Sequence, residues 1–437
     1  MPHHRPVSLP IPPKAGDLLV AGARVLATPE GTRPLAGARS GALRVIDRGA
    51  VAARGGVIAW VGAEADLPEN LSRLPRLDAG GGTVLPGFVD AHTHAVFAGD
   101  REPEFRQRLM GATYAEIAAA GGGILSTVRA TRSATADTLL AELTARLDRM
   151  LLCGTTTAEV KSGYGLDLET EERQLGVVRD ANALHPVDLV PTYMGAHAVP
   201  DEHRHDREGY VRLLLEEGIP RIAAARLAEH CDVFCEAGAF TIDESRRILQ
   251  RARDLGLTLK IHADELTDCG GAGLAAEMGA LSAEHLLKAS PEGIAALARA
   301  GVVAVLLPAT SFFLMTAHAP ARLFRDAGCA MALGTDLNPG SSHTESLPMA
   351  AVLACLGNRM LPEEAIVAMT LNAAAAVGRA ARVGSLEPGK AMDVVVIDAP
   401  SAGHLVYHFG VNLVRHVVKD GRVVVREGVR EVSAHDG

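Results

Sequence analysis

The amino-acid sequence predicts an α/β protein in which a (β/α)8 TIM-type barrel carries a small composite β-sandwich domain from both chain ends. Two observations lead to this fold class. In the middle of the chain, short apolar segments alternate with longer segments rich in Ala, Leu, Glu and Arg, the pattern of buried strands and helices. Toward both ends, β-rich runs are separated by glycine turns and show no helical period. Eight strand–helix units in about 300 residues are typical of a barrel with its active site at the carboxyl ends of the strands.

Eight barrel strands are expected within residues 84–381, each a short apolar run followed by polar or turn-forming residues. In chain order they are Val84–Val89, Thr155–Val160, Val187–Tyr193, Cys231–Cys235, Thr258–Ile261, Ala280–Ala283, Val302–Leu307 and Ala330–Leu333. An open, doubly wound sheet is the alternative arrangement. It is disfavoured because no Gly-x-Gly-x-x-Gly opens a helix after the first strand. The Gly121–Gly123 run also lacks the Lys-Ser/Thr pair of a phosphate loop.

The two ends of the chain are expected to pair into one β domain, made of residues 16–83 and 382–437. The runs that predict strands are Leu18–Val20, Leu43–Ile46, Val57–Val61, Asp393–Asp398 and Val417–Val425. Because each run is short and ends near a turn, a small antiparallel sheet is predicted. Residues 1–15, rich in Pro and His, are expected to be a disordered tail.

Composition and charge narrow the classes of partner. The chain has 437 residues, 48% of them hydrophobic, and a net charge of −9. Its charged residues are interspersed, which argues against a nucleic-acid surface, and no apolar run is long enough to cross a membrane. The six cysteines are scattered without a Cys-x-x-Cys pair, which predicts reduced thiols in a cytoplasmic protein. The expected partner is therefore a small molecule.

Polar side chains follow the predicted strands, and the first two form a His-x-His pair. His92 and His94 end the first strand, and residues i and i+2 of a strand point to the same face. His262 follows strand five and Asp336 follows strand eight. Three imidazoles and one carboxylate suit a divalent or trivalent metal ion that holds one water. Water bound in this way becomes hydroxide near neutral pH, which supplies a nucleophile.

Two more strand-end residues are candidates for proton transfer. Glu265, three residues after His262, is placed to orient or deprotonate the water. His285 follows strand six and is a candidate for bonding the substrate oxygen or sharing the proton relay.

Other residues are candidates for binding the substrate. Arg101 has the planar guanidinium that holds a carboxylate through two donors, and the alternative is an ion pair with Glu102 or Glu104. Tyr164 lies in a glycine-flanked loop, where a phenol can cover a ligand or simply pack. The segment Asn338–Ser341 is either a turn only or a turn whose backbone amides hold a carboxylate.

These residues resemble the metal-dependent amidohydrolase superfamily, and longer segments resemble one of its families, the imidazolonepropionases of histidine degradation. The segments are His92–Arg101, Gly121–Thr127, Gly154–Asp167, Gly195–Ala198, Asp232–Glu236 and Gly334–Ser341. A further segment, Gly384–Asp393, resembles the superfamily's passage back into the β domain. Together they span nearly the whole chain after residue 15.

The resemblance implies an activity and a set of site residues. The activity is hydrolytic ring opening of 4-imidazolone-5-propanoate to N-formimidoyl-L-glutamate, in which a hydroxide on one Zn²⁺ or Fe³⁺ per subunit attacks the cyclic amide carbonyl. A homodimer is common for this architecture. The implied metal ligands are His92, His94, His262 and Asp336, and the implied catalytic residues are Glu265, His285 and Asp336. The implied substrate contacts are Arg101, Tyr164, His197, Glu265, Asn338, Gly340 and Ser341.

Two details and two alternatives accompany this interpretation. Glu284 stands where the family pattern suggests Asp, next to an unchanged His285. Binuclear members of the superfamily have a bridging lysine at the end of strand four, whereas Cys231–Glu236 contains none, so one metal is predicted.

An aminohydrolase acting on a nucleobase-like ring is the nearest alternative, because it could share the metal site. A catalytically inactive barrel that serves as a scaffold is the other, but it predicts gaps in the ligand set.

Overall fold

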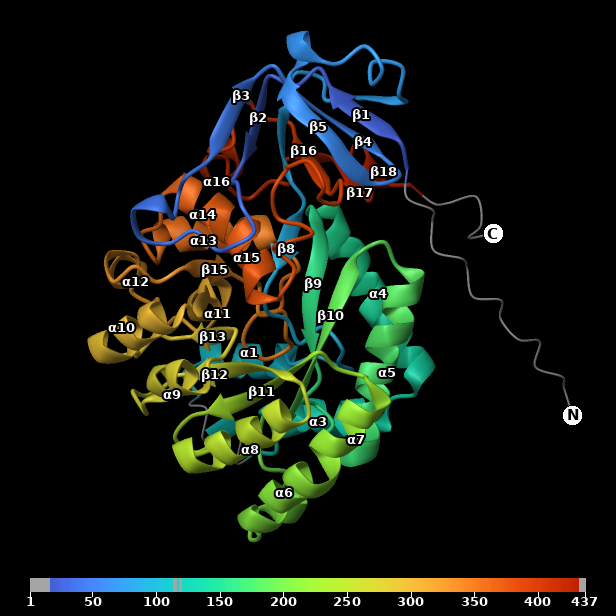
Figure 1. Ribbon diagram of the computed structural model, residues 1–437. Helices are drawn as coiled ribbons and strands as arrows, with labels where there is room; N and C mark the ends of the chain where they lie inside the picture. The colour runs from blue at the N-terminus through green and yellow to red at the C-terminus, as the bar shows by residue number, and fades with distance from the viewer. Residues whose placement is uncertain (1–15, 113–115, 118–119, 432–437) are drawn as a thin grey trace, which may run out of the picture.

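The computed structural model describes residues 16–112, 116–117 and 120–431, with an eight-stranded parallel sheet at the centre of the molecule (Figure 1). Its strands are β8 (Phe88–Asp90), β9 (Thr155–Lys161), β10 (Asp188–Ala196), β11 (His230–Cys235), β12 (Thr258–Ala263), β13 (Ser282–His285), β14 (Val303–Leu306) and β15 (Met331–Leu333). Each strand pairs in parallel with its neighbour in chain order. Each also overlaps one of the eight predicted strands. The predicted tail, residues 1–15, lies outside the described residues.

The sheet closes between the segments that follow its first and last strands. The backbone N–H of Asp336 donates to the His92 carbonyl at 2.9 Å, and the N–H of His94 donates to the Leu337 carbonyl at 2.9 Å. Thr93 and Leu337 form a parallel bridge at the same place. The predicted fold class, a TIM-type barrel with a small β domain, is confirmed. Closure brings the residues after β8 beside those after β15, which are far apart in sequence.

The first predicted strand, Val84–Val89, is divided at Gly87. Its first half is β7 (Thr83–Pro86), which pairs with strands of the smaller domain, and its second half is the barrel strand β8. Pro86 has no N–H to continue a ladder. A Cβ at Gly87 would lie 2.3 Å from the Thr156 hydroxyl oxygen, so only glycine fits where the chain passes from one sheet to the other. The prediction that Val84–Val89 forms one continuous strand was therefore wrong.

Helices follow the barrel strands and cover the sheet. They are α1 (Glu102–Leu109), α3 (Ile124–Ser133), α4 (Ala136–Leu152), α5 (Leu168–Leu184), α6 (Arg207–Leu213), α7 (Ile219–Ala225), α8 (Ile242–Asp254), α9 (Gly271–Met278), α10 (Pro291–Ala300), α11 (Pro308–Phe313), α12 (Ala321–Asp326), α13 (Leu347–Leu356), α14 (Pro362–Ala368) and α15 (Leu371–Ala376). A further helix, α16 (His404–Tyr407), follows a strand of the smaller domain. Several begin at side-chain caps: Asp167 accepts from Thr170 N–H before α5, and Thr241 with Glu244 forms a capping box at α8.

Two further sheets lie together above the barrel in Figure 1 and combine both ends of the chain. One contains β5 (Val57–Ala63), β4 (Gly49–Arg54), β1 (Leu18–Ala21) and β6 (Arg76–Asp78). The other contains β19 (Val429–Arg430), β18 (Arg422–Arg426), β17 (Val414–Lys419), β16 (Val394–Ile397), β7, β2 (Val25–Thr28) and β3 (Arg44–Asp47). Buried residues of both sheets, among them Val20, Val51 and Val396, share one apolar cluster. Two pairings, β1 with β6 and β2 with β7, are parallel, so the prediction of a purely antiparallel sheet was wrong.

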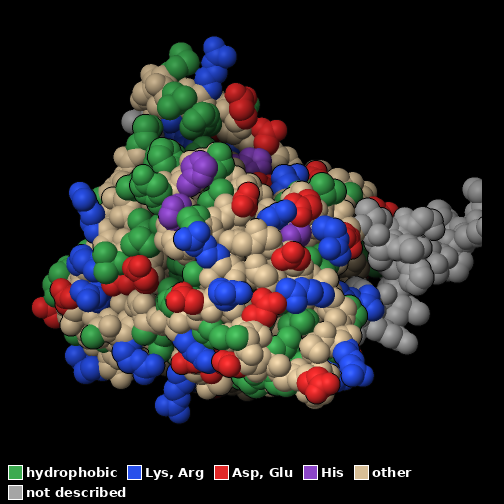
Figure 2. All heavy atoms as spheres, turned by 90° about the horizontal axis from the view of Figure 1, so that it is seen from above, with side chains coloured by type: hydrophobic (Ala, Val, Ile, Leu, Met, Phe, Trp, Pro, Cys, Tyr) green, Lys and Arg blue, Asp and Glu red, His purple; other side chains and the backbone are tan. Residues whose placement is uncertain are grey.

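The surface carries both signs of charge. Figure 2 shows basic and acidic side chains interspersed over the face seen from above. Among the described residues, no helix combines the length and the apolar character needed to span a bilayer. All six cysteines are free thiols.

Candidate metal centre

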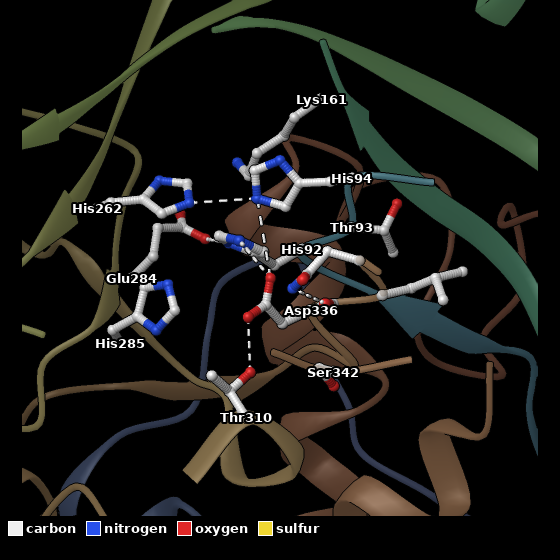
Figure 3. A network of polar contacts seen from close by, with 12 residues as sticks. His92, Thr93, His94, Lys161, His262, Glu284, His285, Thr310, Asp336 and Ser342 are labelled. Carbon is white, nitrogen blue, oxygen red and sulfur yellow. Dashed lines mark hydrogen bonds and ion pairs between the residues drawn. The ribbon is translucent and has the colours of Figure 1, made fainter. Parts of the chain in front are cut away.

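Three imidazoles and one carboxylate converge at the carboxyl ends of the barrel strands (Figure 3). His92 and His94 follow β8, His262 lies on β12, and Asp336 follows β15. The Asp336 Oδ1 atom lies 3.4 Å from His92 Nε2 and 3.8 Å from His94 Nε2. His94 Nε2 in turn lies 3.4 Å from His262 Nε2. The four residues that the sequence predicted as ligands thus come together as one cluster.

Two of the three imidazoles have a carboxylate at the ring nitrogen turned away from the cluster, whereas Nδ1 of His94 has no hydrogen-bond partner among the described residues. His92 Nδ1 contacts Glu284, and His262 Nδ1 lies 3.0 Å from Asp232. His92 Nε2 is buried without a hydrogen-bond partner among the described residues. Burial, followed by nearby positive charge, holds the pKa of His92 well below its usual value. A neutral imidazole with a free, buried Nε2 is the form that binds a metal ion, so this donor set fits one.

Backbone geometry at the barrel seam fixes the cluster. The buried Asp90 carboxylate accepts from Thr335 N–H at 2.9 Å and from the Thr335 hydroxyl at 2.6 Å, and its pKa is raised to about 7, chiefly by burial. This links the strand before His92 to the residue before Asp336. Asp336 and His285 have φ values of +54° and +68°, a region that residues other than glycine seldom adopt and that occurs often at functional sites.

The two predicted proton-transfer residues lie next to the ligand cluster. His285 is the last residue of β13, and its ring centroid lies 5.2 Å from that of His262. Glu265 Oε1 lies 3.6 Å from His285 Nδ1. Burial, reinforced by the charge of Asp336, raises the pKa of Glu265 to about 8. The pKa of Asp336 is itself raised to about 6, chiefly by burial.

The rings of His197 and Tyr164 both lie beside the ring of His94. The His197 ring stacks on His94 at 4.8 Å and an interplanar angle of 18°, and Tyr164 lies 5.8 Å from His94. His197 Nδ1 donates to the Gly163 carbonyl at 3.0 Å, and burial lowers the pKa of His197 to about 3. The loop that carries Tyr164 is ordered by Glu171, whose buried carboxylate accepts the N–H groups of residues 163, 165 and 166.

Arg101 contacts both an acidic residue and the predicted turn. Its Nε donates to Glu104 at 2.8 Å, and the Arg101 and Glu104 side chains are each 13% exposed. The ion-pair alternative for Arg101 is therefore present in this structure. A Cβ at Gly340 would lie only 2.1 Å from Arg101 Nη1, so the guanidinium rests directly on Gly340. Burial raises the pKa of Tyr164, and the charges of Arg101 and Asp336 act on it in opposite directions.

The turn that contains Asn338 is organised by that side chain. Asn338 Oδ1 accepts from Gly340 N–H and Ser341 N–H, both at 2.8 Å. Its Nδ2 donates to the Asp336 carbonyl at 2.7 Å and to the Ser341 hydroxyl at 2.8 Å. The backbone amides that the sequence suggested for a carboxylate are thus bonded to Asn338 in this structure.

A substitution at Gly340 should affect substrate binding more than folding. In Gly340→Ala the added methyl group collides with the end of the Arg101 side chain, which can move, so we expect little change in stability. The displaced guanidinium should raise KM about tenfold, equivalent to about 1.4 kcal/mol. Steady-state kinetics and urea unfolding measure the two effects. Gly176→Ala is the matched control, because a Cβ there meets no atom within 4 Å; equal KM values for the two variants would contradict the prediction.

Sequence reasoning missed several buried charges near the cluster. Asp232 lies on β11, Lys260 on β12 and Glu284 on β13, and their side chains are fully buried. Lys161, on β9, is also buried and pairs with Asp232 at 2.7 Å. A signal existed, since a charged residue inside an otherwise apolar strand needs a partner, but the partners could not be read from the sequence.

Comparisons with known proteins agree with this geometry. Residues 83–424 match the model of the amidohydrolase family. An imidazolonepropionase of Symbiobacterium thermophilum is 54% identical over 417 residues, which cover 94% of this chain and 98% of that protein. Another, of Shouchella clausii, is 52% identical over 401 residues, 91% of this chain and 90% of that one.

A solved structure supports the fold. The crystal structure of atrazine chlorohydrolase from Arthrobacter aurescens, complexed with zinc, is similar with a TM-score of 0.68 and 17% identity, over 95% of this chain and 97% of that chain. At that identity the likeness concerns the fold alone. From the family match and the identity to its relatives over nearly its whole length, the chain belongs to the amidohydrolase family and, within it, to the imidazolonepropionases.

Proposed function

We propose that this site performs the hydrolytic ring opening of 4-imidazolone-5-propanoate, giving N-formimidoyl-L-glutamate in the degradation of histidine. The observation that carries the proposal is the convergence of His92, His94 and His262 on Asp336 at the carboxyl ends of the strands. Relatives that share about half of the sequence are named for this activity. Family membership favours it over the aminohydrolase alternative.

We propose that His92, His94, His262 and Asp336 hold one Zn²⁺ or Fe³⁺. Three nitrogen donors and one carboxylate oxygen suit either ion. When bound, such an ion lowers the pKa of a water ligand to near neutrality and polarises a carbonyl oxygen. The remaining tasks, which are to position the ring, to move protons and to hold the propanoate tail, belong to side chains of the protein.

Opening a cyclic amide requires that water lose a proton and that the departing ring nitrogen gain one. Asp336, which belongs to the ligand cluster, and the neighbouring Glu265 in its ionised form can accept the proton from water. The 3.6 Å separation of Glu265 Oε1 and His285 Nδ1 gives a short route by which that proton reaches the ring nitrogen. His285 can also bond the carbonyl oxygen of the substrate.

We propose that the other end of the substrate lies near Arg101. Among the described residues, Arg101 is hydrogen-bonded through Nε alone, to Glu104, and its two terminal nitrogens can bind a carboxylate through parallel hydrogen bonds. The further proposed contacts are His197, Tyr164, Asn338, Gly340 and Ser341. His197 and Tyr164 stand beside His94 and provide flat surfaces for a planar ring.

One assay separates the proposal from its alternatives. Purified protein is given 4-imidazolone-5-propanoate, and the loss of imidazolone absorbance is followed together with the release of ammonia. Loss of absorbance without ammonia is expected. Ammonia release from a nucleobase-like ring, with no effect on the imidazolone, would support the aminohydrolase instead, and no turnover of either would support a scaffold.

The metal content should be close to one ion per chain in fully active protein. The described groups that could hold a metal share His92, and one of them includes Glu159 and Glu284. Those two carboxylates are already neutralised by Lys161 and Lys260, so they offer no second cation site. Elemental analysis of the active protein, with activity measured on the same sample, tests this; a ratio near two would contradict it.

The oligomeric state, the cellular location and the domain division are proposed from the sequence. We propose a homodimer that acts in the cytoplasm on a small molecule that carries a carboxylate, and not on nucleic acid or membranes. We also propose the division into a composite β domain, residues 16–83 and 382–437, and a barrel, residues 84–381.

A further inference from the structure

A chain of buried charges begins at the metal ligand His92. His92 Nδ1 contacts Glu284. The Glu284 carboxylate lies 3.2 Å from Lys260 Nζ, which lies 3.4 Å from Glu159. Lys260 also donates to the Ala376 carbonyl at 3.1 Å. The side chains of Glu284, Lys260 and Glu159 have no exposed surface, so each ionised group depends on the next for compensation.

The same chain ends at a second metal ligand, His262. Lys161 Nζ lies 2.9 Å from the Glu159 carboxylate and 2.7 Å from Asp232. Asp232 Oδ2 lies 3.0 Å from His262 Nδ1, and Asp232 Oδ1 accepts from His262 N–H at 3.1 Å. The side chains of Lys161 and Asp232 are also fully buried. Five residues, which we call the buried charge chain, therefore connect His92 to His262: Glu284, Lys260, Glu159, Lys161 and Asp232.

Charges alternate along this chain, and carboxylates stand at both ends. A carboxylate can only accept a hydrogen bond when it is ionised, so Glu284 and Asp232 favour the form of each imidazole that carries its proton on Nδ1. That form leaves Nε2 free on the side of Asp336. Burial of five ionised groups costs free energy that apolar residues would not cost, and three carboxylates against two ammonium groups leave one negative charge unmatched. A bound cation would balance it.

We propose that the buried charge chain orients His92 and His262 for metal binding and couples the two, with Glu284 and Asp232 as positioning residues of the metal centre. This inference rests on the metal centre proposed above. It gives Glu284 a specific task, which is to hold Nδ1 of His92. Carboxylates behind metal-ligating histidines typically change metal affinity by about 10- to 100-fold when they are removed.

The test measures Zn²⁺ affinity and not turnover. Metal is removed from purified protein with a chelator, and Zn²⁺ is titrated back in competition with a chromophoric chelator. Glu284→Gln and Asp232→Asn should each bind Zn²⁺ about 10- to 100-fold more weakly. The matched control is Asp393→Asn, which also removes a buried carboxylate bonded to a buried lysine, Lys419 at 2.7 Å, but in the β domain. The control should bind Zn²⁺ within about twofold of wild type.

A milder variant keeps the test decisive if a charge substitution prevents folding. Ser282 donates its hydroxyl to Glu284, so Ser282→Ala loosens Glu284 without removing a charge and should weaken Zn²⁺ binding severalfold. A second variant, Lys260→Met, distinguishes the loss of the group that orients Glu284 from the loss of a positive charge near the metal. Loss of a positive charge near the metal would by itself tighten binding, whereas loss of the group that holds Glu284 should weaken it.

Coupling is tested with the double variant Glu284→Gln/Asp232→Asn. If the chain acts as a unit, the double variant loses less affinity than the product of the two single losses. The inference is overturned if Glu284→Gln binds Zn²⁺ like wild type, if Lys260→Met binds more tightly, or if the two losses simply multiply. Wild-type protein that binds no Zn²⁺ would instead refute the proposed metal centre. The absorption bands of Co²⁺-substituted protein should also shift in Glu284→Gln, because the position of His92 changes.

Discussion

Replacing Asp336 with alanine should remove nearly all turnover while the barrel remains folded. Asp336 Oδ1 is the atom on which the imidazoles of His92 and His94 converge, at 3.4 and 3.8 Å, so the substitution deletes a group that we propose as both metal ligand and proton acceptor. A positioned proton-transfer group alone contributes about 100- to 10,000-fold, and we expect kcat to fall by at least this factor. Stopped assays with high enzyme concentration, together with metal analysis of the same samples, measure the loss.

The backbone at Asp336 requires a second variant. Its φ of +54° suits Asn better than Ala, because Asn tolerates the left-handed region. Asp336→Asn should therefore be as inactive as Asp336→Ala but closer to wild type in urea unfolding. Glu265→Gln is the comparison at a neighbouring carboxylate outside the ligand set, and it should keep its metal while kcat falls. Substantial turnover in Asp336→Asn would contradict the assigned role of Asp336.

The barrel could be predicted from the sequence because its strands are short apolar runs set between helical segments. The seam could not be predicted, since it depends on long-range bonds such as that between Asp336 N–H and the His92 carbonyl. The division at Gly87 was missed for a related reason. A Pro-Gly pair inside an apolar run is compatible with an edge strand, and only the neighbouring Thr156 and the sheet partners of β7 show that two sheets meet there.

The clustering of His92, His94, His262 and Asp336 was predictable because His-x-His and the later strand ends share one position in a barrel. The residues that hold this cluster in place could not be predicted. Asp232 and Glu284 stand inside predicted strands or at their ends, where a carboxylate can face the barrel interior, the helices or solvent. Pairing with Lys161 and Lys260 arises only when the sheet closes. The alternatives for Arg101, a substrate carboxylate or an ion pair with Glu102 or Glu104, stayed open in the sequence because a guanidinium suits either partner.

Arg101→Ala should raise KM strongly and leave kcat less affected. If the guanidinium holds the propanoate of the substrate, its loss removes a charge-assisted pair worth roughly 2–5 kcal/mol. The defect should appear in KM because that end of the substrate does not react. Arg101→Lys should recover only part of the loss, since an ammonium lacks the planar pair of donors. Arg106→Ala, at an exposed position of helix α1, which begins directly after Arg101, is the control and should behave like wild type.

The ion pair with Glu104 sharpens this prediction. Without Arg101, the Glu104 carboxylate has lost its partner at 2.8 Å and repels the carboxylate of the substrate, so part of the defect in Arg101→Ala comes from Glu104. Arg101→Ala/Glu104→Gln should therefore have a lower KM than Arg101→Ala alone. A substrate analogue without the carboxylate should be handled about equally by wild type and Arg101→Ala, because neither the attraction nor the repulsion then operates. If the KM of Arg101→Ala instead rises by the same factor for both compounds, Arg101 stabilises its loop and does not bind the substrate. The carboxylate of the substrate must then be held by other residues.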